Sequence, residues 1–370
     1  MDKTFICDIC GEIHPVDQRT TFDGQELCSH CLDENTLLCR QCNTRIWSDN
    51  NEGSDDHPLC PRCYDRFFTN CSRCGALLLN EDAQYIREDD DDYPYCDNCF
   101  ERQSRNGIHE YHYKPKPYFY GEGNRFFGIE LEIDGAGENG SNARKLLEIG
   151  NIEDNLFYCK RDGSLDEGFE IVTHPMTLQF HQNSMPWDEI MHKAIRMGYY
   201  SHQANTCGLH IHVNRDSLGS TLEQQEDSIA RILFFIENHW NEMLKFSRRT
   251  SRQMERWAAR YGRKDDPKAI LSNAKNSSHG RYTCINLCNT NTIEFRMFRG
   301  TLKYNTLIAT LQIVERICDV AFYLSDDEIK NITWLEFVSG ISKQNMPELI
   351  QYLKERQLYV NEIVESTEEV

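Results

Sequence analysis

Twelve of the 17 cysteines stand in six Cys-x-x-Cys pairs within the first hundred residues. Two residues between the cysteines let both sulfur atoms reach one tetrahedral metal ion, at roughly 2.3 Å per bond, and a second pair completes the four ligands. The pairs are Cys7/Cys10, Cys28/Cys31, Cys39/Cys42, Cys60/Cys63, Cys71/Cys74 and Cys96/Cys99. This spacing predicts three structural Zn²⁺ sites with all twelve thiolates as ligands.

The cysteine pairs also form an internal repeat. Cys7, Cys39 and Cys71 follow one another at intervals of 32 residues, and gaps of 17 to 21 residues separate the two pairs of each repeat. Segments this short cannot bury enough apolar surface to fold alone, so bound metal would supply the missing free energy. Joining consecutive pairs is the simplest arrangement, and a cross-brace between neighbours is the alternative. Disulfides would need an oxidising compartment, and iron–sulfur clusters use other spacings.

A second set of polar residues alternates with apolar ones in four short segments after residue 120. Because alternate residues of a strand share a face, Phe127–Ile133 would present two glutamates on one side and its apolar residues on the other. Leu209–Val213 does the same with two histidines, Ile293–Met297 with a glutamate and an arginine, and Phe169–Val172 with one glutamate. A solvated face is the simpler explanation for any single strand. Four such strands would instead converge on a patch suited to Mg²⁺ or Mn²⁺, with arginines for a phosphate or carboxylate.

Four motifs, in this order, resemble those of the amidoligase family, whose members are relatives of glutamine synthetase and glutamate–cysteine ligase often found in phages and bacteria. The motifs are FGIELE at 127–132, DGSL at 162–165 followed by EIVT at 170–173, CGLHIHV at 207–213, and Asn286 with EFRMFRGTL at 294–302. The resemblance covers roughly residues 120–325 and leaves the zinc modules outside it. It implies an α+β, glutamine-synthetase-like fold, in which helices back an antiparallel sheet.

The resemblance also implies a reaction, in which ATP activates a carboxylate as an acyl phosphate and an amine then attacks it. The implied ligands of Mg²⁺ or Mn²⁺ are Glu130, Glu132, Glu170, His210 and Glu294. The other implied roles are those of Arg296 and Arg299 in holding a phosphoryl group or carboxylate, Asp162 in orienting the nucleophile, Asn286 in contacting substrate, and His212 in binding metal or nucleotide phosphate. Either substrate could be carried by a protein. A metal-dependent hydrolase built on the two histidines and a non-enzymatic zinc-finger scaffold are the alternatives.

Charge and composition narrow the class of partner. The formal net charge is −19, and residues 1–100 hold 21 acidic against 8 basic residues. So acidic a surface repels phosphate backbones, which disfavours nucleic acid and leaves protein contact as the expected role of the zinc modules. The sequence has neither an apolar run long enough to span a membrane nor an N-terminal signal segment, which predicts a cytoplasmic protein.

These patterns divide the chain into parts. We expect three zinc modules over 1–100 (about 7–31, 39–63 and 71–99), a linker over 101–118, and an α+β catalytic domain over 119–370. The linker is expected because alternating Lys-Pro favours extended geometry, although the aromatic residues around it could dock onto either domain.

Three further features of the second domain have a structural and a functional interpretation. Cys207 is expected to be a buried thiol rather than a nucleophile. The G-x-G-x-x-G sequence at 135–140 is expected to be a turn, because a dinucleotide-binding strand is normally buried on both faces and this one carries glutamates. The arginine-rich stretch 248–263 is either an exposed helix or a lid over an anionic ligand.

Overall fold

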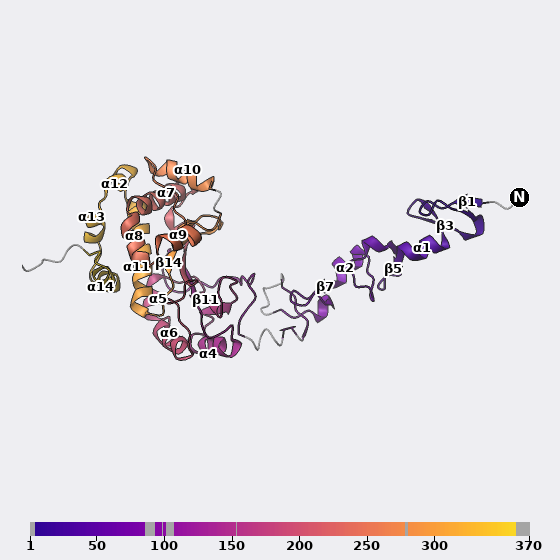
Figure 1. The fold of residues 1–370 in the computed structure, drawn as a ribbon, viewed down its shortest axis with the longest axis horizontal. Coiled ribbons are helices and arrows are strands. Elements are labelled where there is room, and N and C mark those ends of the chain that lie inside the picture. The colour runs from indigo at the N-terminus through magenta and orange to yellow at the C-terminus, as the bar shows by residue number, and fades with distance from the viewer. Residues whose placement is uncertain are drawn as a thin grey trace, which may run out of the picture. The chain divides into compact units, whose positions relative to one another are not determined.

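The computed structural model describes residues 4–85, 93–97, 99–100, 107–152, 154–277 and 280–359. The chain divides into two compact units, residues 1–104 and 105–370. Figure 1 shows the first unit in indigo to violet and the second in magenta to yellow. No helix of the described residues is long and apolar enough to cross a membrane.

The first unit repeats one short antiparallel hairpin three times, each with a Cys-x-x-Cys pair in its turn. The hairpins join β1 (Thr4–Ile6) to β2 (Ile13–Pro15), β5 (Thr36–Leu38) to β6 (Arg45–Trp47), and β7 (Phe68–Asn70) to β8 (Leu77–Leu79). Its other elements are η1 (Val16–Gln18), β3 (Arg19–Phe22), β4 (Gln25–Cys28), α1 (Ser29–Asn35), η2 (Ser48–Asn50), α2 (Pro61–Phe67) and η3 (Asn80–Asp82).

The turn of each hairpin depends on one residue, the one that follows its second cysteine. Gly11, Asn43 and Gly75 have φ values of 72°, 62° and 73°, in the left-handed region that glycine and asparagine tolerate best. Each donates its backbone N–H to the carbonyl of the first cysteine of its pair, at 2.8 to 2.9 Å. The chain therefore reverses tightly around each pair, and the 32-residue repeat of the sequence is also a repeat of the backbone.

The second unit is built on one antiparallel sheet of six strands, in the order β10-β11-β9-β12-β14-β13. The strands are β9 (Phe127–Ile133), β10 (Phe157–Lys160), β11 (Phe169–Thr173), β12 (Gly208–Asn214), β13 (Ile285–Asn286) and β14 (Thr292–Arg299). The apolar residues of β9 are fully buried on one face, as the period of two predicted. The antiparallel sheet confirms the α+β class.

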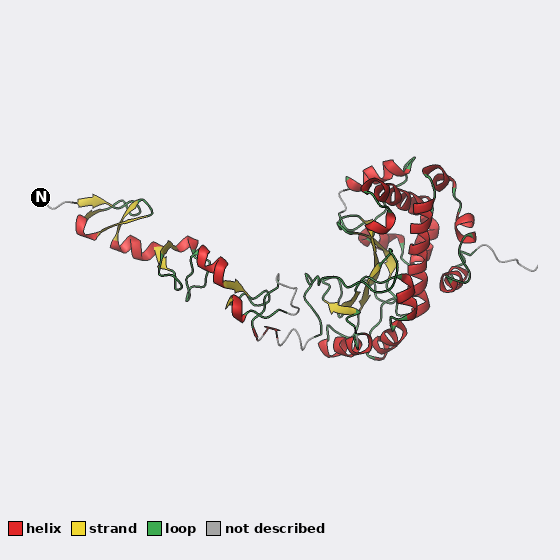
Figure 2. Cartoon of the chain, turned by 180° about the vertical axis from the view of Figure 1, so that it is seen from behind, coloured by secondary structure: helices red, strands yellow, loops and turns green. Residues whose placement is uncertain are grey.

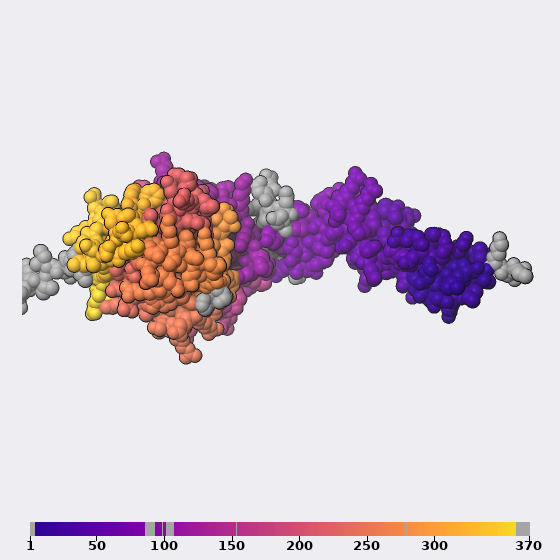
Figure 3. All heavy atoms as spheres, turned by 90° about the horizontal axis from the view of Figure 1, so that it is seen from above, coloured from indigo at the N-terminus to yellow at the C-terminus, as the bar shows by residue number. Residues whose placement is uncertain are grey.

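Helices pack against the sheet and against one another, and Figure 2 shows them in red. They are α4 (Gly140–Gly150), α5 (Leu178–Asn183), α6 (Trp187–Arg196), η4 (Arg215–Leu218), α7 (Leu222–Asn238), α8 (Trp240–Ser247), α9 (Ser251–Trp257), α10 (Pro267–Lys275), α11 (Tyr304–Tyr323), α12 (Asp326–Asn331), α13 (Trp334–Ser339) and α14 (Pro347–Glu355). The buried core includes apolar side chains of both the sheet and α11. In the space-filling view, orange to yellow marks the surface that the later helices form (Figure 3).

A β-bulge changes which way the end of β14 faces. Ile211 pairs with Phe295, but Leu209 pairs with Phe298, so β14 contains one extra residue between these two positions. An extra residue reverses the alternation beyond it. Arg299, opposite Gly208, therefore lies on the polar side of the sheet.

The segment after the third cysteine cluster lies along β10. The N–H of His109 donates to Cys159 O at 2.8 Å, and the N–H of Arg161 donates to His109 O at 2.9 Å. Tyr113 is buried and stacks on the His109 ring, with 3.7 Å between centroids. Residues 107–113, expected as part of a linker, thus pack as part of the second unit, while 101–106 lie outside the described residues.

Candidate functional site

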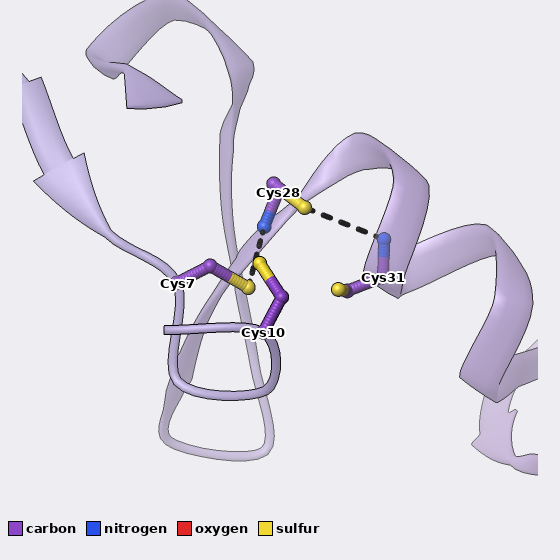
Figure 4. Close-up of side chains that lie close together, drawn as sticks. All are labelled: Cys7, Cys10, Cys28 and Cys31. Carbon is purple, nitrogen blue, oxygen red and sulfur yellow. Dashed lines mark hydrogen bonds between the residues drawn. The ribbon is translucent and has the colours of Figure 1, made fainter. Parts of the chain in front are cut away.

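The sulfur atoms of the first unit gather into three groups of four. In each group, two consecutive Cys-x-x-Cys pairs place their sulfur atoms within 4.8 Å of one another. Figure 4 shows the first group, in which Cys7 and Cys10 lie in a loop opposite Cys28 and Cys31 at the start of α1. The structure therefore has the sequential grouping and not the cross-brace.

The separations of the sulfur atoms fit a tetrahedral metal ion. Cys42 Sγ lies 3.8 Å from Cys60 Sγ, and Cys74 Sγ lies 3.9 Å from Cys96 Sγ. Four sulfur atoms at roughly 2.3 Å from one ion would be about 3.8 Å apart, whereas a disulfide bond is about 2 Å long. All of these cysteines are free thiols that could hold metal ions.

The thiols of the first two clusters differ in how readily they ionise. Burial raises the pKa of Cys7, but neighbouring backbone N–H groups outweigh it and lower the pKa to about 6. The Thr44 hydroxyl lowers the pKa of Cys42 to about 6. Burial and the adjacent thiols raise the pKa of Cys31 to about 12. A cation at the centre of each group would allow all four thiols to become thiolates, which fits a metal site.

In the second unit, side chains from three adjacent strands meet around Glu130. Its Oε2 lies 3.2 Å from His210 Nδ1, and its Oε1 lies 3.3 Å from His212 Nε2. Glu294 Oε1 approaches the same nitrogen of His210 at 3.6 Å. The donor atoms of Glu130, His210 and Glu294 lie within 4.8 Å of one another, so these three residues could hold a metal ion.

Two more buried carboxylates border this group. Glu132 and Glu170 lie opposite each other on β9 and β11 and are only 3% and 1% exposed. Glu132 accepts the Gly208 N–H at 2.5 Å, and its other oxygen lies 3.8 Å from His210 Nε2. Glu170 forms an ion pair with Lys160 at 3.1 Å.

The pKa shifts show where negative charge is poorly compensated. Burial raises the pKa of Glu170, and the Glu130 carboxylate raises it further, outweighing Lys160. Burial also raises the pKa of Glu132. Glu130 is different, because its two histidines hold its pKa well below the usual range despite burial. Carboxylates that resist ionisation beside a mixed oxygen and nitrogen donor set favour a bound divalent cation, so the residues fit such an ion.

Most of the residues predicted from the sequence line one cavity of about 310 Å³. They are Glu130, Asp162, Glu170, His210, His212, Asn286, Glu294 and Arg296. Glu132 lines a smaller adjoining cavity that shares Asp162, His210 and Arg296. Arg299 lines neither of these cavities and faces a third one beyond the bulge.

Two residues with predicted roles are held by Glu294. Arg296 Nη1 lies 2.5 Å from Glu294 Oε1, and the Asn286 amide donates to Glu294 Oε2 at 2.7 Å. Asp162 accepts the N–H of Ser164 at 2.6 Å, and it holds its own turn closed. The arginine and the amide thus fix the carboxylate that faces His210.

Sequence reasoning missed several residues of these cavities. Lys160 ends a four-residue strand too short to recognise, but its position two residues before the DGSL motif was an available signal. Arg281 comes from a segment outside the four motifs, and no local pattern marks it. Arg249 belongs to the arginine-rich stretch 248–263 and Tyr111 to the aromatic residues beside the Lys-Pro segment, but neither pattern placed them at these cavities. Cys207 is buried, as expected from the sequence, and burial raises its pKa.

The second unit contains a region similar to amidoligases. Residues 152–318 match the family described as "Putative amidoligase enzyme". The resemblance inferred from the motifs is thereby confirmed for this region. The match begins after β9, so Glu130 and Glu132 lie outside it.

A solved structure is also similar to the chain, at a low level. It is a bifunctional glutathione synthetase from Pasteurella multocida, with 13% sequence identity and a TM-score of 0.35. The alignment covers 63% of this chain and 46% of that chain, so this chain spans less than half the length of that protein. No curated protein matches the sequence.

Proposed function

We propose that the second unit is an ATP-dependent ligase that joins a carboxylate to an amine through an acyl phosphate. The observation that carries this proposal is the gathering of Glu130, His210 and Glu294 in one cavity together with cations that include Lys160 and Arg296. The amidoligase match over residues 152–318 supports the class of reaction.

The reaction needs two group transfers. A substrate carboxylate oxygen attacks the γ-phosphorus of ATP, and the bond to the oxygen of the departing ADP breaks. The amine nitrogen then attacks the acyl carbon, the bond from that carbon to the phosphate oxygen breaks, and the nitrogen loses a proton. Phosphoryl transfer of this kind is catalysed chiefly by positioning and by neutralising charge, which a cavity of fixed acids and cations provides.

The residues predicted from the sequence have distinct roles in this scheme. Glu130, His210 and Glu294 would hold Mg²⁺ or Mn²⁺, with Glu132 and Glu170 beside them and His212 as a further donor. When bound, the ion would neutralise the phosphate oxygens. Arg296 extends from Glu294 into the cavity and would bind the transferred phosphoryl group or the substrate carboxylate.

Asn286 and Asp162 would act in different ways. Because the Asn286 amide donates to Glu294, we assign it to positioning that carboxylate rather than to contacting substrate. Asp162 lines both adjoining cavities and would orient the amine and accept its proton. Arg299 faces a different cavity, and this scheme gives it no role in phosphoryl transfer.

The first unit would bind three Zn²⁺ ions and recruit a protein. The four-thiol groups have the ligand number and separations of structural zinc sites. Residues 1–100 hold 21 acidic and only 8 basic residues, and this negative charge favours a partner with a basic surface. Such a partner could carry one of the substrates.

The test is to incubate the protein with ATP, Mg²⁺ or Mn²⁺ and pooled amino acids or cell lysate, and to follow ADP, phosphate and new amides. We expect release of ADP and phosphate that falls about a hundredfold in Glu130→Gln. The matched control is Glu148→Gln, which removes an exposed carboxylate from α4 and should leave turnover unchanged.

Three results would contradict the proposal. Equal turnover in Glu130→Gln would exclude the assigned cavity. Product release without ATP would favour the metal-dependent hydrolase. Absence of turnover with every acceptor, in protein that retains its zinc, would favour the non-enzymatic scaffold.

A further inference from the structure

A cavity of about 380 Å³ lies where β14 ends, and its walls are mostly cationic. We call it the cationic cavity. It is lined by His202, Asn241, Leu244, Lys245, Arg248, Arg249, Arg299 and Arg356. Five of these eight residues are lysine or arginine and none is a carboxylate, although the chain as a whole carries a net charge of −19. The local charge is therefore opposite to that of the protein.

The cations of this cavity are fixed by backbone carbonyls rather than by acids. Arg249 donates to Phe298 O at 3.2 and 3.3 Å, and Arg356 donates to Lys245 O at 2.7 and 3.1 Å. Among the residues that the structure describes, none of the five forms an ion pair. Carbonyl oxygens orient a guanidinium group without cancelling its charge, so the positive potential of the cavity remains.

Other features show that these charges are under mutual repulsion. Burial lowers the pKa of Arg249 to about 10; the charge of Glu132 opposes this shift, and the neighbouring arginines add to it. The Nε atom of Arg299 is buried without a hydrogen-bond partner. A buried donor without a partner is costly, which adds to the cost of holding this cation here.

Arg248 adopts an unusual backbone conformation at the edge of the same cavity. It caps α8 with a φ of 65°, in the left-handed region where glycine is the common residue. Its Nη1 donates to Gly300 O at 3.1 Å and also lies 3.1 Å from His202 Nδ1. These two contacts hold the Arg248 guanidinium at the cavity although its backbone conformation is strained.

A second cavity, of about 510 Å³, adjoins the cationic one and has a different character. The two share His202, Arg248 and Arg356. Its other walls include five aromatic or aliphatic residues that could contact an organic group: Ile195, Tyr199, Tyr200, Leu302 and Tyr352. Its one carboxylate, Glu355, forms an ion pair with Lys303 at 3.1 Å. We call this the tyrosine cavity.

We propose that the two cavities together bind an organic phosphate ester, with the phosphate in the cationic cavity and the organic group in the tyrosine cavity. A phosphate dianion presents three oxygens and can satisfy several guanidinium groups, whereas a carboxylate satisfies about one. Tyrosine faces and aliphatic walls suit a ring or an apolar chain. Because no acid lines the cationic cavity, this phosphate would bind without a divalent ion. The site is additional to the ATP and metal cavity of the proposed ligase and does not depend on that activity.

The test of the phosphate half is calorimetric titration of the full zinc-loaded chain with phenyl phosphate in buffer free of Mg²⁺. We expect saturable binding that weakens about tenfold in Arg356→Gln and about tenfold in Arg299→Gln. The matched control, Arg252→Gln, removes an exposed arginine that lines none of these cavities and should bind like the wild type. Unchanged binding in both test variants would overturn the proposal.

The organic half needs its own variant, because free phosphate could fill the cationic cavity alone. We expect Tyr200→Ser to weaken phenyl phosphate about fivefold while leaving inorganic phosphate unchanged. Equal affinity of the wild type for both probes would overturn the assignment to an ester and leave a site for free phosphate.

A third variant separates this inference from the ligase proposal. Glu130→Gln should bind phenyl phosphate like the wild type, because Glu130 lines neither cavity. Altered binding in Glu130→Gln, with no change in Arg356→Gln, would place the phosphate in the cavity that Glu130 lines and contradict the inference.

Discussion

The two units of this chain both gather potential metal ligands, but they support those ligands in different ways. In the first unit, cysteines make up much of the buried clusters, as with Cys7, Cys28 and Cys31 beside Leu27 and Leu32. In the second unit, a large apolar core of sheet and helices holds the glutamates and histidines on the opposite face of the sheet. A metal ion would therefore be part of the fold in the first unit and part of the chemistry in the second.

The largest expected effect is the response of the two units to loss of metal. Structural zinc sites supply apparent binding energies of about 10 kcal/mol or more, so a strong chelator should unfold the region 4–85. Residues 107–359 should stay folded, because their core does not include a metal ligand cluster of this kind. Limited proteolysis with and without chelator would measure this. Resistance of the first unit after zinc removal, or digestion of the second, would break the comparison.

A substitution in the apolar core of the second unit should destabilise that unit and leave the first unit folded. Leu131 is fully buried on the apolar face of β9, opposite the face that carries Glu130 and Glu132, and Leu131→Ala should lower the free energy of unfolding of the second unit by about 2–5 kcal/mol. Zinc content should stay at three ions per chain, since the first unit folds around its own ligands. Thermal unfolding and metal analysis would report the two quantities. Leu131→Ala protein that has lost zinc would show that the units do not fold independently.

Neutralising a carboxylate of the cavity should separate stability from function. The raised pKa of Glu132 means that folding disfavours its charged form, so its contribution to stability rises as the pH falls through that pKa. Glu132→Gln keeps an acceptor for the Gly208 N–H and removes the charge. The free energy of unfolding at pH 7 should be unchanged or up to about 1 kcal/mol higher, while ATP turnover falls about a hundredfold.

Melting temperature and ADP release, measured on the same preparation, would test this separation. A loss of both would mean that Glu132 is needed for folding. Retention of both would remove Glu132 from the site.

The smallest effects concern the turns of the cysteine hairpins. Gly75→Ala should weaken the third zinc site by about 1 kcal/mol, because alanine is strained at a φ of 73°. Asn43→Gly should change the second site by only a few tenths of a kcal/mol, since asparagine already tolerates this region. Competition with a coloured zinc chelator would compare the variants. Equal effects of the two substitutions would show that backbone strain does not limit these sites.

How far the sequence predicts each region depends on whether the signal is local. The six Cys-x-x-Cys pairs follow from short-range spacing, because a tight turn brings the two sulfur atoms of a pair close together. Which pairs share a metal site did not follow, since the sequence left both the sequential grouping and the cross-brace open and the structure has the sequential one. The faces of β9 and β12 follow from an alternation of period two, which needs no knowledge of the neighbouring strand. The position of Arg299 could not be predicted in this way, because a β-bulge near Arg296 reverses the alternation of β14. The bulge depends on how β14 pairs with β12, which the sequence of β14 alone does not show.

The remaining gaps have the same origin. Lys160 meets Glu170 only through the pairing of β10 with β11, and Arg249 reaches both the cationic cavity and the cavity beside Glu132 only through packing of distant segments. The sequence shows the aromatic residues of the segment 107–113 and the Lys-Pro repeats that follow them. It does not show that the segment packs along β10, because this packing depends on β10 being at the edge of the sheet.

The most direct test of the proposed ligase is to follow the oxygen atoms of the carboxylate substrate. With an ¹⁸O-labelled carboxylate, ATP and Mg²⁺, we predict that one ¹⁸O atom per amide formed appears in inorganic phosphate, and that Glu130→Gln abolishes this transfer. Phosphate without label, while amide or hydrolysis product accumulates, would contradict an acyl phosphate and with it the account of the second unit.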